Sequence, residues 1–232
     1  MILGLCGHSG AGKDTFADRL VLKYGWQKVA LADPLKRICQ QVYDFTDQQL
    51  WGPSECRNAP DKRYFRPDGD PRFPYLTPRE ALQLLGTEWG RRCYDNTWVD
   101  LAIRTAKDIL AGRAYHQHLG LGPEVPPGTP KHLAPRRATG VVIPDVRFKN
   151  ELDAIRAAGG RVVRLIRLGK DGQVGIAGHA SEAEQDGLPN DAFDRVLCVP
   201  EGLDAYADAI DYLMQFEDFA CRTYSRNPGE QP

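Results

Sequence analysis

The chain has 232 residues, and its 42% hydrophobic content is enough to bury the core of one α/β domain. Its 30 basic and 31 acidic side chains leave a formal net charge of −1, which excludes a strong electrostatic footprint for general nucleic-acid binding. The six cysteines form no Cys-x-x-Cys pair, so we expect reduced thiols of a cytoplasmic protein and no zinc site.

The most specific motif lies at the start of the chain. An apolar run at residues 1–6 is followed by the glycine-rich segment GHSGAGKDT at 7–15 and by an amphipathic segment that ends near Gly25. This order of strand, turn and helix is typical of a P-loop, in which backbone N–H groups and the helix dipole bind phosphate. It predicts a nucleoside triphosphate site made by Gly7, Ser9, Gly10, Ala11, Gly12, Lys13, Asp14 and Thr15.

The metal position departs from the common P-loop pattern. Asp14 stands where a serine or threonine usually binds Mg²⁺, and Thr15 comes one residue later. Asp14 is expected to hold the ion directly or through water, and the motif leaves open which of the two residues is the ligand. Lys13 is expected to reach the β- and γ-phosphates of the nucleotide.

The first half of the chain then predicts a strand at 27–32 and a helix at 33–43, with Asp33 as its N-cap and Pro34 at its first position. Residues 52–75 are polar and aperiodic, which predicts a long mobile loop. The capping box at 77–80 predicts a helix that ends near Gly90. A further helix is expected at 98–110, with Gly112 at its exit.

In the second half, the Pro-rich and basic segment 120–137 predicts a flexible loop. The run at 141–143 predicts a buried parallel strand that ends at Asp145. A helix at 149–158, strands at 161–168 and 195–199 and a helix from 203 to about 219 follow. No apolar run approaches the length of a membrane span, and residues 1–6 lack the charged start of a signal peptide.

The carboxyl ends of parallel strands are where α/β proteins place their chemistry, so Asp145 is the leading acidic catalytic candidate and Arg147 extends the site. The alternative is that Asp145 only caps the turn after its proline. Arg164 and Arg167 lie three apart on a strand and therefore face opposite ways. Arg167, which is nearer the following loop, is the better candidate for meeting the charge of a transferred phosphoryl group.

An acceptor that carries its own phosphate needs a second cationic pocket. Lys36 lies at the start of the helix predicted at 33–43. Arg79 lies in a first helical turn, where its charge opposes the helix dipole and favours a ligand role. His179, in the His-x-Ser-Glu run at 179–182, is either a contact to nucleotide or acceptor or part of a helix start, and the residues leave both open.

Five blocks occur together in the order GKDT at 12–15, LADPLK at 31–36, LQLLGTE at 82–88, VIPDVR at 142–147 and HASE at 179–182. In this order they resemble the deoxynucleoside monophosphate kinase family of tailed bacteriophages, within the P-loop nucleoside monophosphate kinases. The resemblance implies a three-layer α/β fold with a mainly parallel sheet, helices on both faces and mobile acceptor-binding and lid segments. It also implies ATP and Mg²⁺, transfer of the γ-phosphate to a deoxynucleoside monophosphate for phage DNA synthesis, a homodimer, and the cytoplasm of an infected bacterium.

Carried over by position, the resemblance implies a single domain at 1–224. Within it lie an acceptor-binding insertion at about 34–96, a flexible loop at about 113–138 and a lid at about 168–190, and a disordered tail follows at 225–232. The implied catalytic residues are Lys13, Asp145, Arg147 and Arg167. The implied substrate-binding residues are Asp33, Lys36, Arg79, Gln83, Glu88 and His179. The chain departs from the family in its loops at 52–75 and 120–137, which leaves base specificity open.

Two other functions stay open at this stage. A kinase of hydroxymethylated pyrimidines in DNA would use the same loop, with the basic residues of 131–137 against the strand, but the near-neutral charge speaks against it. A non-catalytic ATP-binding switch would not need acidic and basic candidates at several strand ends. Free nucleotides are therefore the expected partners, with DNA a partner only under the first alternative.

Overall fold

The computed structural model describes residues 1–67, 74–113, 138–167 and 187–215. Its centre is a five-stranded parallel sheet in the order β2-β3-β1-β4-β5. The strands are β1 (Ile2–Cys6), β2 (Gln27–Lys28), β3 (Val141–Val146), β4 (Arg161–Ile166) and β5 (Arg195–Cys198). The first strand of the chain therefore lies in the middle, between β3 and β4. This arrangement confirms the predicted α/β fold of a P-loop kinase.

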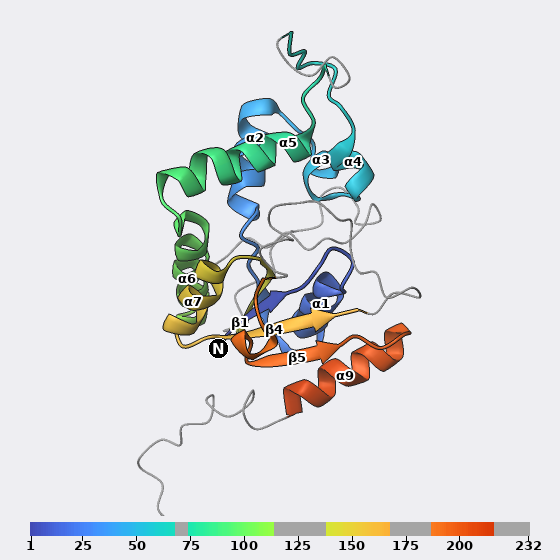
Figure 1. Cartoon of the computed structure of the whole chain (residues 1–232), viewed down its shortest axis with the longest axis vertical. Helices are drawn as coiled ribbons and strands as arrows, with labels where there is room; N and C mark the ends of the chain where they lie inside the picture. The colour runs from blue at the N-terminus through green and yellow to red at the C-terminus, as the bar shows by residue number, and fades with distance from the viewer. Residues whose placement is uncertain (68–73, 114–137, 168–186, 216–232) are drawn as a thin grey trace, which may run out of the picture.

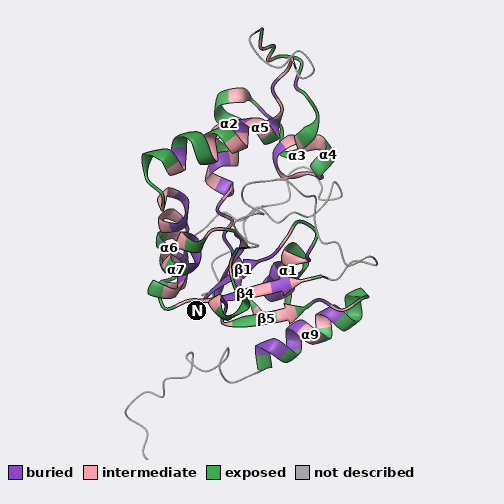
Figure 2. Cartoon of the chain, viewed as in Figure 1, coloured by how far each residue is buried: buried purple, intermediate pink, exposed green. Residues whose placement is uncertain are grey.

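Helices cover both faces of the sheet, as Figure 1 shows. Helices α6 (Thr97–Leu110) and α7 (Lys149–Ala157) lie on one face, and α1 (Lys13–Tyr24) and α9 (Leu203–Gln215) lie on the other. Because side chains alternate along a strand, β1 serves both layers. Leu3 and Leu5 pack in the α1 and α9 core, whereas Ile2 and Cys6 pack in the α6 and α7 core. Buried residues of these helices are coloured purple in Figure 2.

A helical arm stands beyond the sheet (Figure 1). It consists of α2 (Asp33–Tyr43), α3 (Asp47–Trp51), α4 (Ser54–Asn58), α5 (Pro78–Gln83) and the π-helix η1 (Leu84–Arg91). The arm has a small apolar core of its own, made by Cys39, Phe45, Leu50, Leu76 and Ala81. It occupies most of the segment predicted as the acceptor-binding insertion.

Two predictions at the base of the arm are wrong. The strand predicted at 27–32 is only two residues long, because the backbone N–H groups of Leu31 and Ala32 bind the Asp145 carboxylate instead of a neighbouring strand. Asp33 is not the N-cap of α2, since Ala32 occupies that position without a side-chain hydrogen bond. The Asp33 carboxylate is buried and accepts from the indole N–H of Trp51 at 3.2 Å.

The prediction of a long mobile loop at 52–75 is also wrong for its described residues. This stretch contains α4 and an antiparallel bridge between Phe65 and Tyr75, and residues 68–73 lie outside the description. The preceding α3 was missed, although a capping box signals its start: Thr46 Oγ1 accepts from Gln49 N–H, and the Gln49 side chain accepts from Thr46 N–H.

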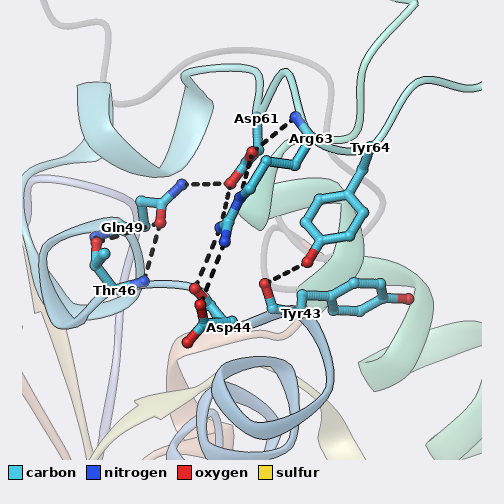
Figure 3. A network of polar contacts seen from close by, with 7 residues as sticks. All are labelled: Tyr43, Asp44, Thr46, Gln49, Asp61, Arg63 and Tyr64. Carbon is cyan, nitrogen blue, oxygen red and sulfur yellow. Dashed lines mark hydrogen bonds and ion pairs between the residues drawn. The ribbon is translucent and has the colours of Figure 1, made fainter.

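A polar network around Asp61 orders the arm (Figure 3). The buried Asp61 carboxylate accepts from Gln49 Nε2 at 3.0 Å and from Arg63 Nη2 at 2.7 Å. Hydrogen bonds from Arg63 hold the pKa of Asp61 well below its usual range, although burial opposes this shift. Tyr64 donates its hydroxyl to the carbonyl of Tyr43 at 2.6 Å. The network thereby ties residues 61–64 to the end of α2 and to α3.

The other described elements lie close to their predicted positions. Thr77 caps α5 by accepting from Glu80 N–H at 3.1 Å, and the helix continues as η1 to Arg91. Gly90 permits the packing of η1 on α6, because a Cβ there would lie 2.3 Å from Trp98 Cζ2. Residues 114–137, 168–186 and 216–232, which include most of the predicted flexible loop, lid and tail, lie outside the described residues. None of the helices described is both long and apolar enough to cross a membrane.

Candidate functional site

The glycine-rich loop joins β1 to α1 at the centre of the sheet edge. Gly12 has a φ of 91°, a left-handed conformation that favours glycine, and α1 begins at the next residue, Lys13. The Lys13 ammonium folds back over the loop and donates to the carbonyls of Gly7 at 2.5 Å and His8 at 2.7 Å. Burial and the nearby Arg147 lower its pKa. The N-terminus of α1 thus holds a cation against two backbone carbonyls of the glycine-rich loop.

Two side chains from the far end of the chain contact this loop. The buried Tyr206 of α9 donates its hydroxyl to the Gly12 carbonyl at 3.0 Å, and a Cβ on Gly12 would lie 2.9 Å from Tyr206 Cε1. Arg167, just beyond β4, donates to the Gly10 carbonyl at 3.4 Å. Sequence reasoning missed Tyr206, since the C-terminal helix gave only an amphipathic pattern.

Arg164 faces away from the loop. Its guanidinium donates to the Leu188 carbonyl at 2.8 Å and to Asn190 Oδ1 at 3.1 Å, and it lies 5.2 Å from the centre of the Phe193 ring. The two strand-end arginines therefore diverge, and only Arg167 contacts the glycine-rich loop.

Asp14 is paired with a lysine that sequence reasoning missed. Lys28 of β2 is buried, and its ammonium lies 2.8 Å from Asp14 Oδ1 and 3.3 Å from Asp18 Oδ1. Desolvation raises the pKa of Asp14, but the attraction of Lys28 outweighs it and the net shift is downward. The Asp14 side chain is 83% exposed, so its ionised carboxylate stays open to the solvent side of the loop.

The chemistry of these side chains fits Mg²⁺, which prefers carboxylate and hydroxyl oxygens. Asp14 supplies the carboxylate and the exposed Thr15 supplies the hydroxyl, both in the first turn of α1. The described residues contain no cluster of three or more His, Cys, Asp or Glu side chains that could hold a metal ion. An ion at this position would therefore need further oxygens from a bound phosphate chain.

Asp145 connects the sheet to the arm. Its carboxylate accepts from the N–H groups of Leu31 at 2.9 Å and Ala32 at 3.1 Å, so it holds the turn before α2 rather than the turn after Pro144. Burial raises its pKa, and the two backbone donors oppose that shift. The same carboxylate lies within electrostatic reach of both Lys13 and Lys36.

On the arm, Lys36 lies one turn into α2, with its ammonium 5.5 Å from the centre of the Trp51 ring. Burial lowers the pKa of Lys36, while Asp33, Asp145 and Asp14 raise it. The charge of Asp145 acts on both Lys13 and Lys36, and its hydrogen bonds to the turn before α2 link the helix of Lys36 to the sheet edge at the glycine-rich loop.

Arg79 lies further along the arm, exposed at the start of α5, where its Nε donates to Asn58 Oδ1 at 2.5 Å. A second arginine that sequence reasoning missed, Arg57 of α4, lies beside it. The Arg57 guanidinium donates to the Gly52 carbonyl at 2.5 Å and to Ser54 Oγ at 3.2 Å. Its position in a stretch assigned to a mobile loop concealed it.

Four predicted site residues remain to be placed: Arg147, Gln83, Glu88 and His179. Arg147 is exposed beyond the end of β3, and its backbone N–H donates to Glu151 Oε2 at 2.8 Å. Gln83 ends α5, Glu88 is exposed on η1, and His179 lies outside the described residues. The structure thus places Lys13, Asp14 and Thr15 in the first turn of α1, and it joins Asp145 to the turn before α2, the helix that carries Lys36.

Comparison with known proteins adds one related sequence. No family model matches the chain. A protein of Acanthamoeba polyphaga mimivirus named "Putative deoxynucleotide monophosphate kinase" is 32% identical over 169 residues. The match covers 73% of this chain and 75% of the viral protein. The relative is not a bacteriophage protein, so the match does not depend on a phage origin.

Proposed function

The chain belongs to the deoxynucleotide monophosphate kinase family, and on that premise we propose that it transfers the γ-phosphate of ATP to a deoxynucleoside monophosphate. The products would be the deoxynucleoside diphosphate and ADP, and the diphosphate would serve as a precursor for viral DNA. The observation that carries the proposal is that Asp145, on the strand next to β1, binds the turn before α2 and so links the helix of Lys36 to the sheet edge where the glycine-rich loop and Lys13 lie. A reaction between two phosphorylated substrates needs two cationic sites that meet in this way.

In the proposed reaction the loop holds the donor. Its backbone N–H groups and the N-terminus of α1 would bind the β- and γ-phosphates of ATP, and Lys13 would leave the loop carbonyls of Gly7 and His8 to contact the same oxygens. Arg167 and Arg147 lie on either side of β1, at the ends of β4 and β3. Both would stabilise the charge that develops on the transferred group.

When the nucleotide is bound, Asp14 and Thr15 would hold Mg²⁺, which would supply positive charge against the phosphates. Lys28 would keep the Asp14 carboxylate ionised and fixed beside the loop. On the acceptor side, Lys36 and Arg79 would hold the monophosphate. Asp145 would act as a positioning residue, since its carboxylate fixes the turn from which α2 carries Lys36.

The proposal is tested by measuring ADP formation with Mg²⁺ and ATP against separate acceptors. These are the four common deoxynucleoside monophosphates, the matching ribonucleotides, and duplex DNA that contains a hydroxymethylated pyrimidine. We expect turnover with at least one free deoxynucleotide and little with DNA. Turnover only on the modified DNA would replace the proposed acceptor, and ATP binding without turnover on any acceptor would make the protein a nucleotide-binding switch.

A further inference from the structure

Helix α4, in the 52–75 segment, contributes a cation to the arm. Arg57 lies on α4, where its side chain is half-buried, and desolvation lowers its pKa. Repulsion from Arg79 is the next cause of the same shift, so the two guanidinium groups are electrostatic neighbours. Two like charges have been brought together on adjacent short helices.

The hydrogen bonds of this pair are made to neutral oxygens in the part of the arm that the structure describes. Arg57 donates to the Gly52 carbonyl and to Ser54 Oγ, and Arg79 donates to Asn58 Oδ1. Neither guanidinium forms an ion pair within 4.0 Å among these residues. Neutral acceptors orient the two arginines without pairing either with a carboxylate, and their mutual repulsion favours the binding of an anion between them.

The helices that carry the two arginines are packed against the rest of the arm. Helix α4 packs on α3 and α5, and Gln49 of α3 is bound to the buried Asp61 carboxylate (Figure 3). Asp14 at the glycine-rich loop lies within electrostatic reach of both Arg57 and Lys36. Helix α5, which carries Arg79, also packs on α2, so the arginine pair lies beside the helix that carries Lys36.

We propose that Arg57 of α4 and Arg79 of α5 together bind the phosphate dianion of the acceptor nucleotide. A phosphate monoester carries close to two negative charges at neutral pH and offers three acceptor oxygens, so it matches two guanidinium groups in charge and in hydrogen-bond geometry. This inference rests on the proposed function, since it names the group that would hold the acceptor.

The test measures binding without turnover, by titration calorimetry with each deoxynucleoside monophosphate and, separately, with ATP and Mg²⁺. Arg57→Met and Arg79→Met should each weaken monophosphate binding by at least about tenfold, because each loses charge-assisted hydrogen bonds. Their affinity for ATP should stay within about twofold of that of the original protein. Lys62→Met, which removes an exposed cation from the same segment, is the matched control and should change neither affinity.

If Arg57→Met fails to fold, Arg57→Lys serves instead; it keeps the charge but loses the planar fork and should weaken monophosphate binding less than Arg79→Met does. An Arg57 variant that is folded and binds monophosphate as tightly as the original protein would overturn the inference. An original protein that binds ATP but none of the monophosphates would instead refute the proposed function, so the two failures are distinguishable.

Discussion

At the scale of single residues, substitution of Lys13 tests the donor site most directly. Its ammonium donates to two loop carbonyls, so Lys13→Met removes hydrogen bonds worth about 0.5–1.5 kcal/mol each and should lower stability only modestly. Loss of the cation at the transferred phosphate should reduce kcat by about 10²-fold or more. Steady-state kinetics and thermal unfolding measured on the same sample check both expectations; a kcat within tenfold of the original would contradict the donor-site role.

The residues predicted from sequence share a feature: each lies in, or next to, a short local pattern. The glycine-rich run gave Lys13 and Asp14, and the end of a β-branched strand gave Asp145. Tyr206, Lys28 and Arg57 carry no such local signal. Their roles arise only where α9 meets the loop, where β2 meets α1 and where α4 meets α5, and a single sequence does not reveal these tertiary contacts.

At the scale of elements, α9 supports the loop through one hydroxyl. Tyr206→Phe keeps the aromatic packing on Gly12 but removes the hydrogen bond to its carbonyl. We expect a loss of about 1 kcal/mol in the free energy of unfolding and a severalfold rise in the KM for ATP with a smaller change in the KM for the acceptor. Tyr212→Phe, at an exposed position of the same helix, is the control. Equal increases in the two KM values would argue against a specific effect on the loop.

The Asp61 network should decide whether the 44–66 part of the arm is ordered. Asp61→Asn removes the charge that binds Arg63 and replaces one acceptor oxygen with a donor. The free energy of local opening should fall by about 1–3 kcal/mol, so limited proteolysis should cleave this part of the arm faster. Glu55→Gln, at an exposed position of α4, should leave cleavage almost unchanged. Equal cleavage rates for Asp61→Asn and the original protein would show that the network does not set local order.

Element boundaries were predicted well where a local cap or period marks them and poorly where a tertiary partner decides. Thr77 marked α5, and Gly25 and Gly112 marked the ends of α1 and α6. The length of β2 was overestimated because the backbone N–H groups of Leu31 and Ala32 donate to the Asp145 carboxylate of β3 rather than to a neighbouring strand. The stretch around α4 was taken for a loop because this helix buries none of its residues and shows no apolar pattern; it is held by packing on α3 and α5.

At the scale of the whole molecule, Glu151 joins the arm to the sheet. Its buried carboxylate accepts from the N–H groups of Arg147 and Phe148 and pairs with Arg91 at the end of η1, at 3.3 Å. Desolvation raises the pKa of Glu151 from 4.5 to about 7, and nearby Asp145 adds to the shift. The folded protein therefore binds more protons than the unfolded chain between these two pH values.

The resulting contribution of Glu151 to stability is full below about pH 4.5, falls as the pH rises to about 7 and is constant above that value. Glu151→Gln does not titrate. The unfolding free energy of the original protein minus that of this variant should decrease across the same window, as measured by urea unfolding at several pH values. The control Asp153→Asn, exposed on α7, retains Glu151, so its unfolding free energy minus that of Glu151→Gln should decline across the same window. A difference that stays level or rises with pH would contradict the raised pKa.

The overall architecture was predictable because apolar strands, caps and glycines repeat in the order that a parallel sheet with crossover helices requires. The blocks resembling a nucleotide kinase family added the fold, and the mimivirus relative supports the same family. The arrangement of the arm against the glycine-rich loop was not predictable in detail. It depends on Asp145, whose backbone partner Leu31 lies 114 positions away in the sequence, and on the contacts of Lys28 and Arg57, which no local pattern marks.

The most direct test of the central claim follows the label from ATP that carries ³²P in its γ-phosphate. The protein is incubated with this ATP, Mg²⁺ and one deoxynucleoside monophosphate at a time, and the products are separated by chromatography. The account predicts label in the β-phosphate of a deoxynucleoside diphosphate, formed about 10²-fold or more slowly by Lys13→Met. Label found only in inorganic phosphate, or only in DNA supplied as a competing acceptor, would contradict it.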